Sequence, residues 1–296
     1  MFRNILVPLD GSKLSEASLR AAAVLAEKLG STVTLLHVIE QAAPTEVHKE
    51  RHLTRPDEAE AYLNETAQRA FPTDVRVATH VHAAPVADVA RSIVEHAAAE
   101  FKPDLIMTCT HGRGGVHDLL FGNIAQQIVA QNTTPLLLIK PDSGPFELRR
   151  ILVPLDPDSM HDEGLPPAEA LATAFKAELA LLSVIPTFST LTGEQVATSS
   201  LMPAATQAVL DLREERAQDE LIRHVERLEA SGINCSSKVA RGDPATTIVR
   251  RAEGTNTDLI VLSTHRKAGL AAFWSRSVAP QVVQGTRIPL LLIPIS

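Results

Sequence analysis

Cysteine is scarce in this sequence, since only Cys109 and Cys235 occur among its 296 residues. Two cysteines in a chain of this length do not make the disulfide framework of a secreted domain, so we expect a reducing compartment. No apolar run approaches the roughly 18 residues that a membrane span needs. The first four residues lead into an apolar run without a signal-peptide pattern. These absences predict a cytoplasmic protein without a membrane partner.

Positive charge is also limited. The chain has 28 Lys and Arg residues against 35 Asp and Glu residues, a formal net charge of −7. With no basic excess to neutralise a phosphate backbone, nucleic acid is not expected as a partner. The Gly-x-x-x-x-Gly-Lys-Ser/Thr pattern is missing, which excludes an ordinary P-loop ATPase. Any nucleotide must therefore be held locally, by backbone dipoles with or without a bound cation.

An internal repeat is the strongest pattern present. The hexapeptide Ile-Leu-Val-Pro-Leu-Asp stands at 5–10 and again at 151–156, and Pro-Leu-Leu-Leu-Ile stands at 135–139 and again at 289–293. Two shorter matches, Asp-Leu-Ile and then Thr-His, fall between them in the same order in both halves. Ordered matches at a nearly constant offset indicate a tandem duplication. We predict domains at 1–142 and 147–296, joined at a Pro/Gly-rich turn.

Strand-like and helix-like segments alternate within each half. In the first half, strands are expected at 5–9, 33–39, 75–81, 105–108 and 136–139, and helices at 12–30, 57–70, 85–99 and 123–130, while 40–56 is polar and unpatterned. In the second half, strands are expected near 151, 179, 233, 259 and 290, a long helix at about 204–229, and a loop at 186–203. This alternation predicts a parallel, doubly wound α/β sheet in each half.

A glycine-rich stretch, residues 108–123, separates the fourth expected strand from the next helix. Its glycines are Gly112, Gly114, Gly115 and Gly122. Strand, glycine loop and helix together present backbone N–H groups and a positive helix end to an anion. Asn123 is a suitable N-cap for that helix. The stretch is interpreted as a phosphate cradle; the alternative is a connection that needs only positive φ angles.

The same stretch carries a family resemblance. The signature of the universal stress proteins is Gly, two residues, Gly, nine residues, Gly, then Ser or Thr. Here Gly112 and Gly122 are separated by nine residues, whereas Cys109 and Asn123 stand at the first glycine and the Ser/Thr positions. Val-Pro-Leu-Asp, Asp-Leu-Ile, Thr-His-Gly-Arg-Gly-Gly and Pro-Leu-Leu-Leu-Ile extend the likeness, so the chain resembles a tandem member of this family.

The resemblance implies a fold. Each half would be a Rossmann-like, adenine nucleotide alpha hydrolase-like sheet of five parallel strands in the order 3-2-1-4-5. The two halves would pack about a pseudo-twofold axis through their last strands, which also hides two strand edges. The duplication would supply the pair of domains that the family usually forms as a dimer, and two chains could pair again as a homodimer.

The resemblance also implies ATP or a related adenine nucleotide, with or without Mg²⁺, in the first half. In an open α/β sheet the ligand lies where strand order reverses, here between the first and fourth strands. Adenine and ribose would contact Pro8, Leu9, Asp10 and Val38; the phosphates would contact the loop and helix start, with Thr108, Cys109, His111, Gly112, Arg113, Gly122, Asn123 and Ile124 as site residues. The Cβ and sulfur of Cys109 would narrow the space in which ribose or phosphate approaches the backbone.

Several of these residues have alternative roles. Asp10 is either a hydrogen-bond acceptor for the ligand or an N-terminal cap for the helix near Ser12. Arg113 either reaches phosphate or is solvated, and His111 either faces phosphate or packs. Cys109 is a redox-sensitive thiol near a helix N-terminus or an inert one.

The second half departs further from the signature. Ser263, Arg266 and Arg276 occupy its three glycine positions, and only Ser277 fits. The arginine side chains would fill the space that phosphates need, so this half is interpreted as degenerate and structural. The alternative is that Arg266 and Arg276 bind a different anion.

Histidines form two further patterns. His48 and His52 have the i, i+4 spacing of a metal pair on a helix, although no third ligand is evident and a solvated segment is the alternative. His80 and His82 alternate on an expected strand and therefore share one face.

The preferred function is a non-catalytic, nucleotide-binding stress or regulatory protein that acts on an unidentified protein partner. One alternative is slow ATP hydrolysis or adenylyl transfer, for which His111 is the sole positioned general base. The other is a scaffold that binds no nucleotide.

Overall fold

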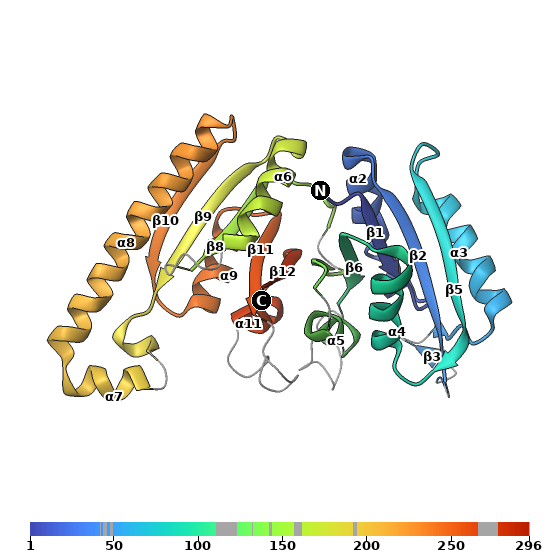
Figure 1. Ribbon diagram of the computed structural model, residues 1–296, viewed down its shortest axis with the longest axis horizontal. Helices are drawn as coiled ribbons and strands as arrows, with labels where there is room; N and C mark the ends of the chain where they lie inside the picture. Colours follow the sequence, from blue (N-terminus) through green and yellow to red (C-terminus); the bar gives the residue numbers. More distant parts are fainter. Residues whose placement is uncertain are drawn as a thin grey trace. The chain divides into compact units, whose positions relative to one another are not determined.

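The computed structural model describes residues 1–41, 43, 46–47, 50–110, 123–131, 133–141, 144–156, 162–191, 194–265 and 278–295 (Figure 1). The chain divides into two compact units. The first contains the described residues of 1–146, 264–276 and 289–296, and the second those of 147–263 and 277–288. Within the described residues, no helix combines the length and the apolar character needed to cross a membrane.

The first unit is built on a parallel sheet. Its strands in chain order are β1 (Asn4–Pro8), β2 (Thr32–Glu40), β5 (Arg76–Val86), β6 (Leu105–Cys109) and β7 (Leu136–Ile139). They hydrogen-bond in the order β5-β2-β1-β6-β7, which is the predicted order 3-2-1-4-5. Ile5, Leu6 and Val7 of β1 are fully buried, because both faces of the sheet are covered by helices.

The helices of the first unit form two groups. They are α1 (Lys13–Glu16), α2 (Leu19–Leu29), α3 (Pro56–Ala70), α4 (Val89–His96) with the π-helix η1 (Ala97–Phe101), and α5 (Asn123–Gln131). α2 contacts α3, whereas α4 contacts α5 (Figure 1). Right-handed crossovers in this strand order place the first pair on one face of the sheet and the second pair on the other.

One expectation for the first unit is wrong. The helix predicted from Pro85 begins at Val89, with Asp88 as its N-cap, and Pro85 lies inside β5. β5 is an outer strand, where a missing N–H removes no ladder bond. In the segment without a sequence pattern, β3 (Glu46–Val47) pairs antiparallel with β4 (Glu50–Arg51); His48 of the His48–His52 pair lies outside the described residues.

The second unit repeats the scheme. Its sheet contains β8 (Arg150–Leu155), β9 (Glu178–Ile185), β10 (Cys235–Arg241) and β11 (Leu259–His265), hydrogen-bonded in parallel in the order β10-β9-β8-β11. Its helices are η2 (Asp162–Gly164), α6 (Leu165–Phe175), η3 (Phe188–Thr190), α7 (Glu194–Leu201), α8 (Pro203–Ala230), α9 (Pro244–Gly254) and α11 (Val278–Gly285). α8 is the predicted long helix, but the loop predicted at 186–203 is wrong, because η3 and α7 occupy most of it.

The last strand of the second repeat belongs to the first unit. β12 (Leu290–Ile295) pairs antiparallel with β7, with Leu290 opposite Leu138 and Leu292 opposite Leu136. The predicted pairing of the two last strands is therefore confirmed. It covers the edge of β7, which is short and made of four buried aliphatic residues.

The repeated Asp-Leu-Ile sequence has a structural cause. The Asp104 carboxylate accepts hydrogen bonds from the backbone N–H groups of Arg3 and Asn4 at 2.8 and 2.9 Å. Asp258 does the same in the second repeat, where the N–H groups of Arg149 and Arg150 both donate at 2.8 Å. Each aspartate thus satisfies donors at the start of the central strand of its sheet.

Candidate functional site

The candidate site lies at the carboxyl edge of the first unit's sheet, where β1 and β6 end next to each other. These strands pair in parallel, with Ile5 opposite Leu105 and Leu6 opposite Ile106. The chain crosses from β1 to β2 on one side and from β6 to β7 on the other, so strand order reverses here. Open α/β sheets bind ligands at such a point.

The structure brings together part of the predicted set. The described residues that reach this edge from β1, β2 and β6 are Pro8, Leu9, Asp10, Val38, Thr108 and Cys109. The predicted phosphate contacts His111, Gly112, Arg113 and Gly122 lie outside the described residues. α5 begins at Asn123, as predicted, and the side chain of Ile124 is exposed.

Leu9 and Val38 are apolar residues of this edge. Their side chains are only 4 % and 6 % exposed. The backbone N–H of Leu9 donates to the carbonyl of Leu36 at 2.8 Å, which extends the pairing of β1 with β2. Both side chains are therefore almost fully packed, and the polar contacts to a ligand must come from their neighbours.

Asp10 builds the turn from β1 into α1. Its Oδ1 accepts hydrogen bonds from the backbone N–H of Ser12 at 2.9 Å and from the Ser12 hydroxyl at 2.6 Å. Ser12 is the N-cap of α1, since its Oγ accepts from the backbone N–H of Ser15 at 3.2 Å. Asp10 thus supports the cap without being the cap. Its two bonds to Ser12 involve only Oδ1.

The segment around β4 covers one side of the candidate site, and sequence reasoning missed this. The backbone N–H of Lys13 donates to Glu50 Oε2 at 2.6 Å. Leu53 lies against Gly11, whose φ is +91°; a Cβ at Gly11 would stand 2.8 Å from Leu53 Cγ and Cδ1. Gly11 is therefore required both by its backbone angle and by the close approach of Leu53.

His37 ties this covering segment to β1. Its Nδ1 lies 2.7 Å from the carbonyl oxygen of Leu9, and its Nε2 lies 3.2 Å from that of Leu53. A neutral imidazole can donate to only one of these oxygens. Burial lowers the pKa of His37 against the opposing effect of the two carbonyls, so the neutral ring dominates at neutral pH. A histidine between the apolar pairs Leu35–Leu36 and Val38–Ile39 of β2 was the available signal.

Thr110 provides a buried hydroxyl at the end of β6. Its backbone N–H donates to the carbonyl of Ile139 at 2.9 Å. Its Oγ1 is buried and has no hydrogen-bond partner within the described part of the chain. The equivalent Thr264 differs, since its Oγ1 donates to the carbonyl of Ile293 at 3.4 Å. Among the described residues, the threonine hydroxyl is therefore bonded in the second repeat and unpaired in the first.

Ser263 is also bonded within the second repeat. It occupies the position of Cys109, and its Oγ accepts the backbone N–H of Gly164 at 3.0 Å. That bond anchors the start of α6 and fits the structural interpretation of the second repeat. Arg266, Arg276 and Ser277 lie outside the described residues.

These features define the class: a duplicated, doubly wound α/β protein with a candidate ligand edge in the first repeat. The sequence model of the universal stress protein family matches residues 1–140 and again residues 147–294. The chain therefore belongs to the universal stress protein family, with two copies of its domain, as the sequence predicted.

Individual relatives agree with this assignment. The universal stress protein MJ0531 of Methanocaldococcus jannaschii is 28 % identical over 147 residues, which cover 49 % of this chain and 81 % of that protein. A universal stress protein from Archaeoglobus fulgidus has a similar fold, with a TM-score of 0.71 and 18 % identity over 98 % of this chain and 96 % of the other. Protein PA1789 of Pseudomonas aeruginosa gives a TM-score of 0.66 and 19 % identity over 99 % and 92 %.

Proposed function

We propose that the first domain, residues 1–142, binds ATP or a related adenine nucleotide at the carboxyl edge of β1 and β6. One observation carries this proposal: strand order reverses at this edge, and the buried Thr110 hydroxyl there has no partner among the described residues. A buried unpaired hydroxyl is unfavourable unless a ligand, a water molecule or further protein completes it. Leu9 and Val38 of the same edge are apolar, which suits a purine ring.

The proposed contacts divide by chemistry. Adenine and ribose lie against Pro8, Leu9 and Val38, with Asp10 accepting from a ribose hydroxyl or the adenine amine. Backbone N–H groups of the glycine loop and the start of α5 hold the phosphates; the residues involved are Thr108, Cys109, His111, Gly112, Arg113, Gly122, Asn123 and Ile124. A Mg²⁺ ion bound with the nucleotide would offset the phosphate charge.

The protein then acts as a stress-response or regulatory protein without dedicated catalysis. Nucleotide occupancy would order the glycine loop and change the surface that an unidentified protein partner meets. The second domain, residues 147–296, supports the first, because its Ser263 and Thr264 hydroxyls are already used for internal bonds.

The test is the nucleotide content of the purified protein, measured by acid extraction and chromatography. About one ATP per chain is expected in the wild type, and none in Gly122→Arg, whose side chain fills the cradle. Gly254→Arg is the matched control, since Gly254 has no positive φ and no atom within 4 Å of an added Cβ. ATP retained in Gly122→Arg would refute the proposed site. No ATP in any form, even after incubation with millimolar Mg-ATP, would refute nucleotide binding.

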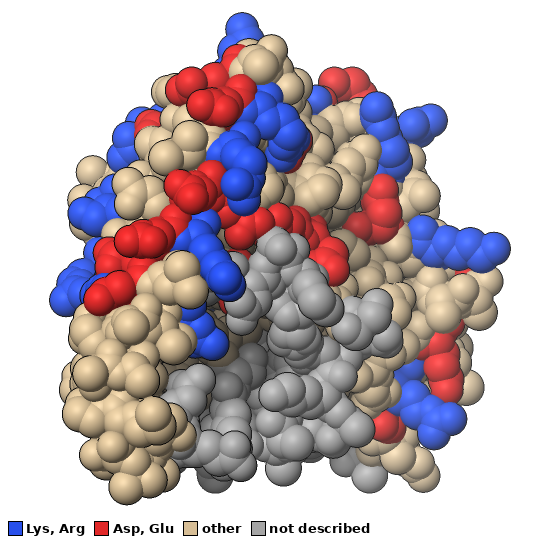
Figure 2. Space-filling model, turned by 60° about the vertical axis from the view of Figure 1, so that its left-hand side comes forward, with Lys and Arg blue, Asp and Glu red and all other residues tan. Residues whose placement is uncertain are grey.

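A scaffold that binds no nucleotide is the second candidate, and a surface of the second unit favours it. Residues 195–210 contain no charged side chain. Leu201, Met202 and Val209 in this segment are exposed, Leu201 by 83 %. Figure 2 shows charged side chains gathered over the upper part of this face and an uncharged region at the lower left. Exposed apolar side chains of this size are typical of interaction surfaces.

A further inference from the structure

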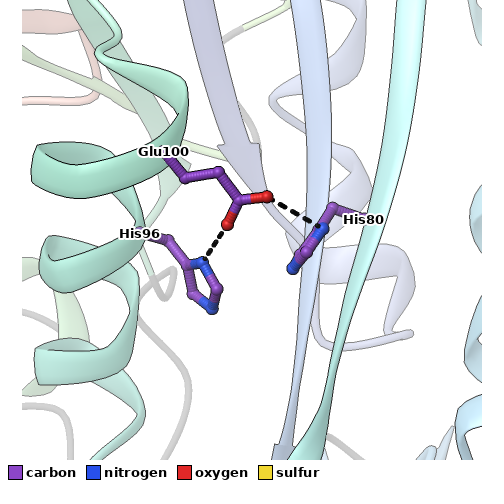
Figure 3. A group of neighbouring side chains, drawn as sticks. All are labelled: His80, His96 and Glu100. Atoms are coloured by element: carbon purple, nitrogen blue, oxygen red, sulfur yellow. Dashed lines mark hydrogen bonds and ion pairs between the residues drawn. The ribbon is translucent and has the colours of Figure 1, made fainter.

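A cluster of three histidines and one glutamate lies on β5, α4 and η1, where His82 pairs in register with Val38 of the candidate nucleotide site. His80 and His82 come from the outer strand β5, His96 is the last residue of α4, and Glu100 lies in η1. Figure 3 shows His80 and His96 on either side of the Glu100 carboxylate, to which both point. One ligand atom from each of His80, His96 and Glu100 can be chosen so that all three lie within 4.8 Å of one another.

The local structure explains why these side chains meet. Successive residues of a strand point to opposite faces, so His80 and His82 share the face that α4 covers, while Thr79 bonds to Asn64 of α3 on the other face. His96 and Glu100 are one helical turn apart. The chain changes there from α4 to the π-helix η1, a rare element that is often found at functional sites.

The distances suit a tetrahedral transition-metal ion. His96 Nδ1 lies 2.9 Å from Glu100 Oε2, and His80 Nδ1 lies 3.7 Å from Glu100 Oε1. Zinc binds histidine nitrogen and carboxylate oxygen at about 2.0–2.2 Å, which separates tetrahedral ligand atoms by roughly 3.3–3.5 Å. The two distances lie on either side of that value but end on different oxygens of the carboxylate, so the Glu100 side chain must turn to present one oxygen to the ion.

The rings are already oriented by their surroundings. His96 Nε2 lies 2.8 Å from His82 Nδ1, so a metal bound at Nδ1 of His96 leaves the other nitrogen to donate to His82. The Phe101 ring stacks on His96 with centroids 5.8 Å apart and meets His80 edge-on at 5.1 Å. Preset rings reduce the ordering that metal binding requires.

We propose that His80, His96 and Glu100 bind one Zn²⁺ ion, with water as the fourth ligand and His82 as the hydrogen-bond partner of His96. Two imidazoles and one carboxylate are a donor set that zinc accepts, whereas Mg²⁺ and Ca²⁺ prefer oxygen. The ion would link the outer strand β5 to α4. Glu100 is half exposed, so the ion can exchange with solvent.

The experiment titrates ZnCl₂ into the full chain, stripped with chelator and free of nucleotide, by isothermal calorimetry. The wild type is expected to show a binding step that disappears in His80→Ala and His96→Ala. His82→Ala should keep the step with an affinity about 10- to 100-fold lower, because it removes only a hydrogen-bond partner. Glu100→Gln should also weaken it, and unchanged apo melting curves confirm that each variant folds.

His224→Ala is the matched control. His224 belongs to a second group of neighbouring ligand atoms, with Asp162 and Glu220. That group offers one imidazole, whereas the proposed zinc site offers two. The zinc step should survive in this variant. A step that survives in His96→Ala and His80→Ala, or that is lost in His224→Ala instead, would overturn the proposal. Absence of any step in the wild type would also overturn it, whatever the result for nucleotide binding.

Discussion

Gly11→Ala should destabilise the first unit far more than an alanine at another left-handed glycine. Gly11 has a φ of +91°, and its new Cβ would stand 2.8 Å from Leu53 Cγ and Cδ1. The left-handed backbone costs roughly 1–2 kcal/mol for a residue with a Cβ. Displacing a packed leucine adds roughly 1–3 kcal/mol. The expected loss in the free energy of unfolding is therefore about 2–5 kcal/mol.

Gly30→Ala is the control within the same unit. Gly30 is also left-handed, with a φ of +67°, but an added Cβ would meet only the end of the Arg3 side chain at 3.4 Å. The free energy of unfolding of Gly30→Ala should fall only by the cost of the left-handed backbone, about 1–2 kcal/mol. Urea unfolding followed by far-UV circular dichroism measures both variants, and the slope with urea should not change.

The double variant Gly11→Ala with Leu53→Ala isolates the contact. Removing the leucine side chain should make Gly11→Ala less damaging by about 1–3 kcal/mol than it is in the wild type. If Gly11→Ala is no worse than Gly30→Ala, or if the two changes simply add, then Leu53 moves aside freely. The segment that contains it would then not be fixed over the end of β1.

Three further predictions concern other parts of the chain. Asp258→Ala should lower the free energy of unfolding of the second unit by about 2–3 kcal/mol in urea, since two N–H groups lose a charged acceptor. The free energy of unfolding should fall as the pH drops below about 6.5, because burial lowers the pKa of His37 and the unfolded chain takes up the proton first. Thermal melts of His37→Gln at several pH values should show a smaller fall. An unchanged fall would mean that another group causes the pH dependence. Burial raises the pKa of Cys235 to about 11, so iodoacetamide at pH 8 should label Cys109 first, as peptide mass spectrometry would show. Equal labelling rates would contradict that order.

The fold could be predicted because its signals are redundant. The buried runs, their alternation with helices and the repeat all point to the same doubly wound sheet. The repeat also identified Asp104 and Asp258, although their shared role as acceptors for the first strand became evident only in the structure.

Local exceptions have local causes. The helix start at Pro85 was wrong because proline is tolerated in an outer strand as well as at a helix N-terminus, and sequence pattern does not tell them apart. The β3–β4 hairpin has two-residue strands, too short for any periodicity.

The candidate site was predicted where it follows from topology and missed where it follows from packing. The position of Asp10 beside the end of β6 results from strand order alone. The closeness of Leu53 to Gly11 and to His37 depends on how an unpatterned segment folds back, which no periodic signal records. Only part of the histidine cluster could be predicted. Strand alternation indicates that His80 and His82 share one face, but it does not indicate that α4 packs against that face.

The placement of β12 has a consequence for synthesis of the chain. β7 is complete at Ile139, but the strand that covers its edge begins at Leu290. At roughly 5–20 residues per second, a ribosome needs about 8–30 s to make the intervening residues. During that interval an aliphatic strand edge of the nascent first domain is open to any neighbouring chain. Duplication within one polypeptide thus delays completion of the first sheet. During this delay a partly folded intermediate with an open β7 edge persists, and a chaperone can bind it.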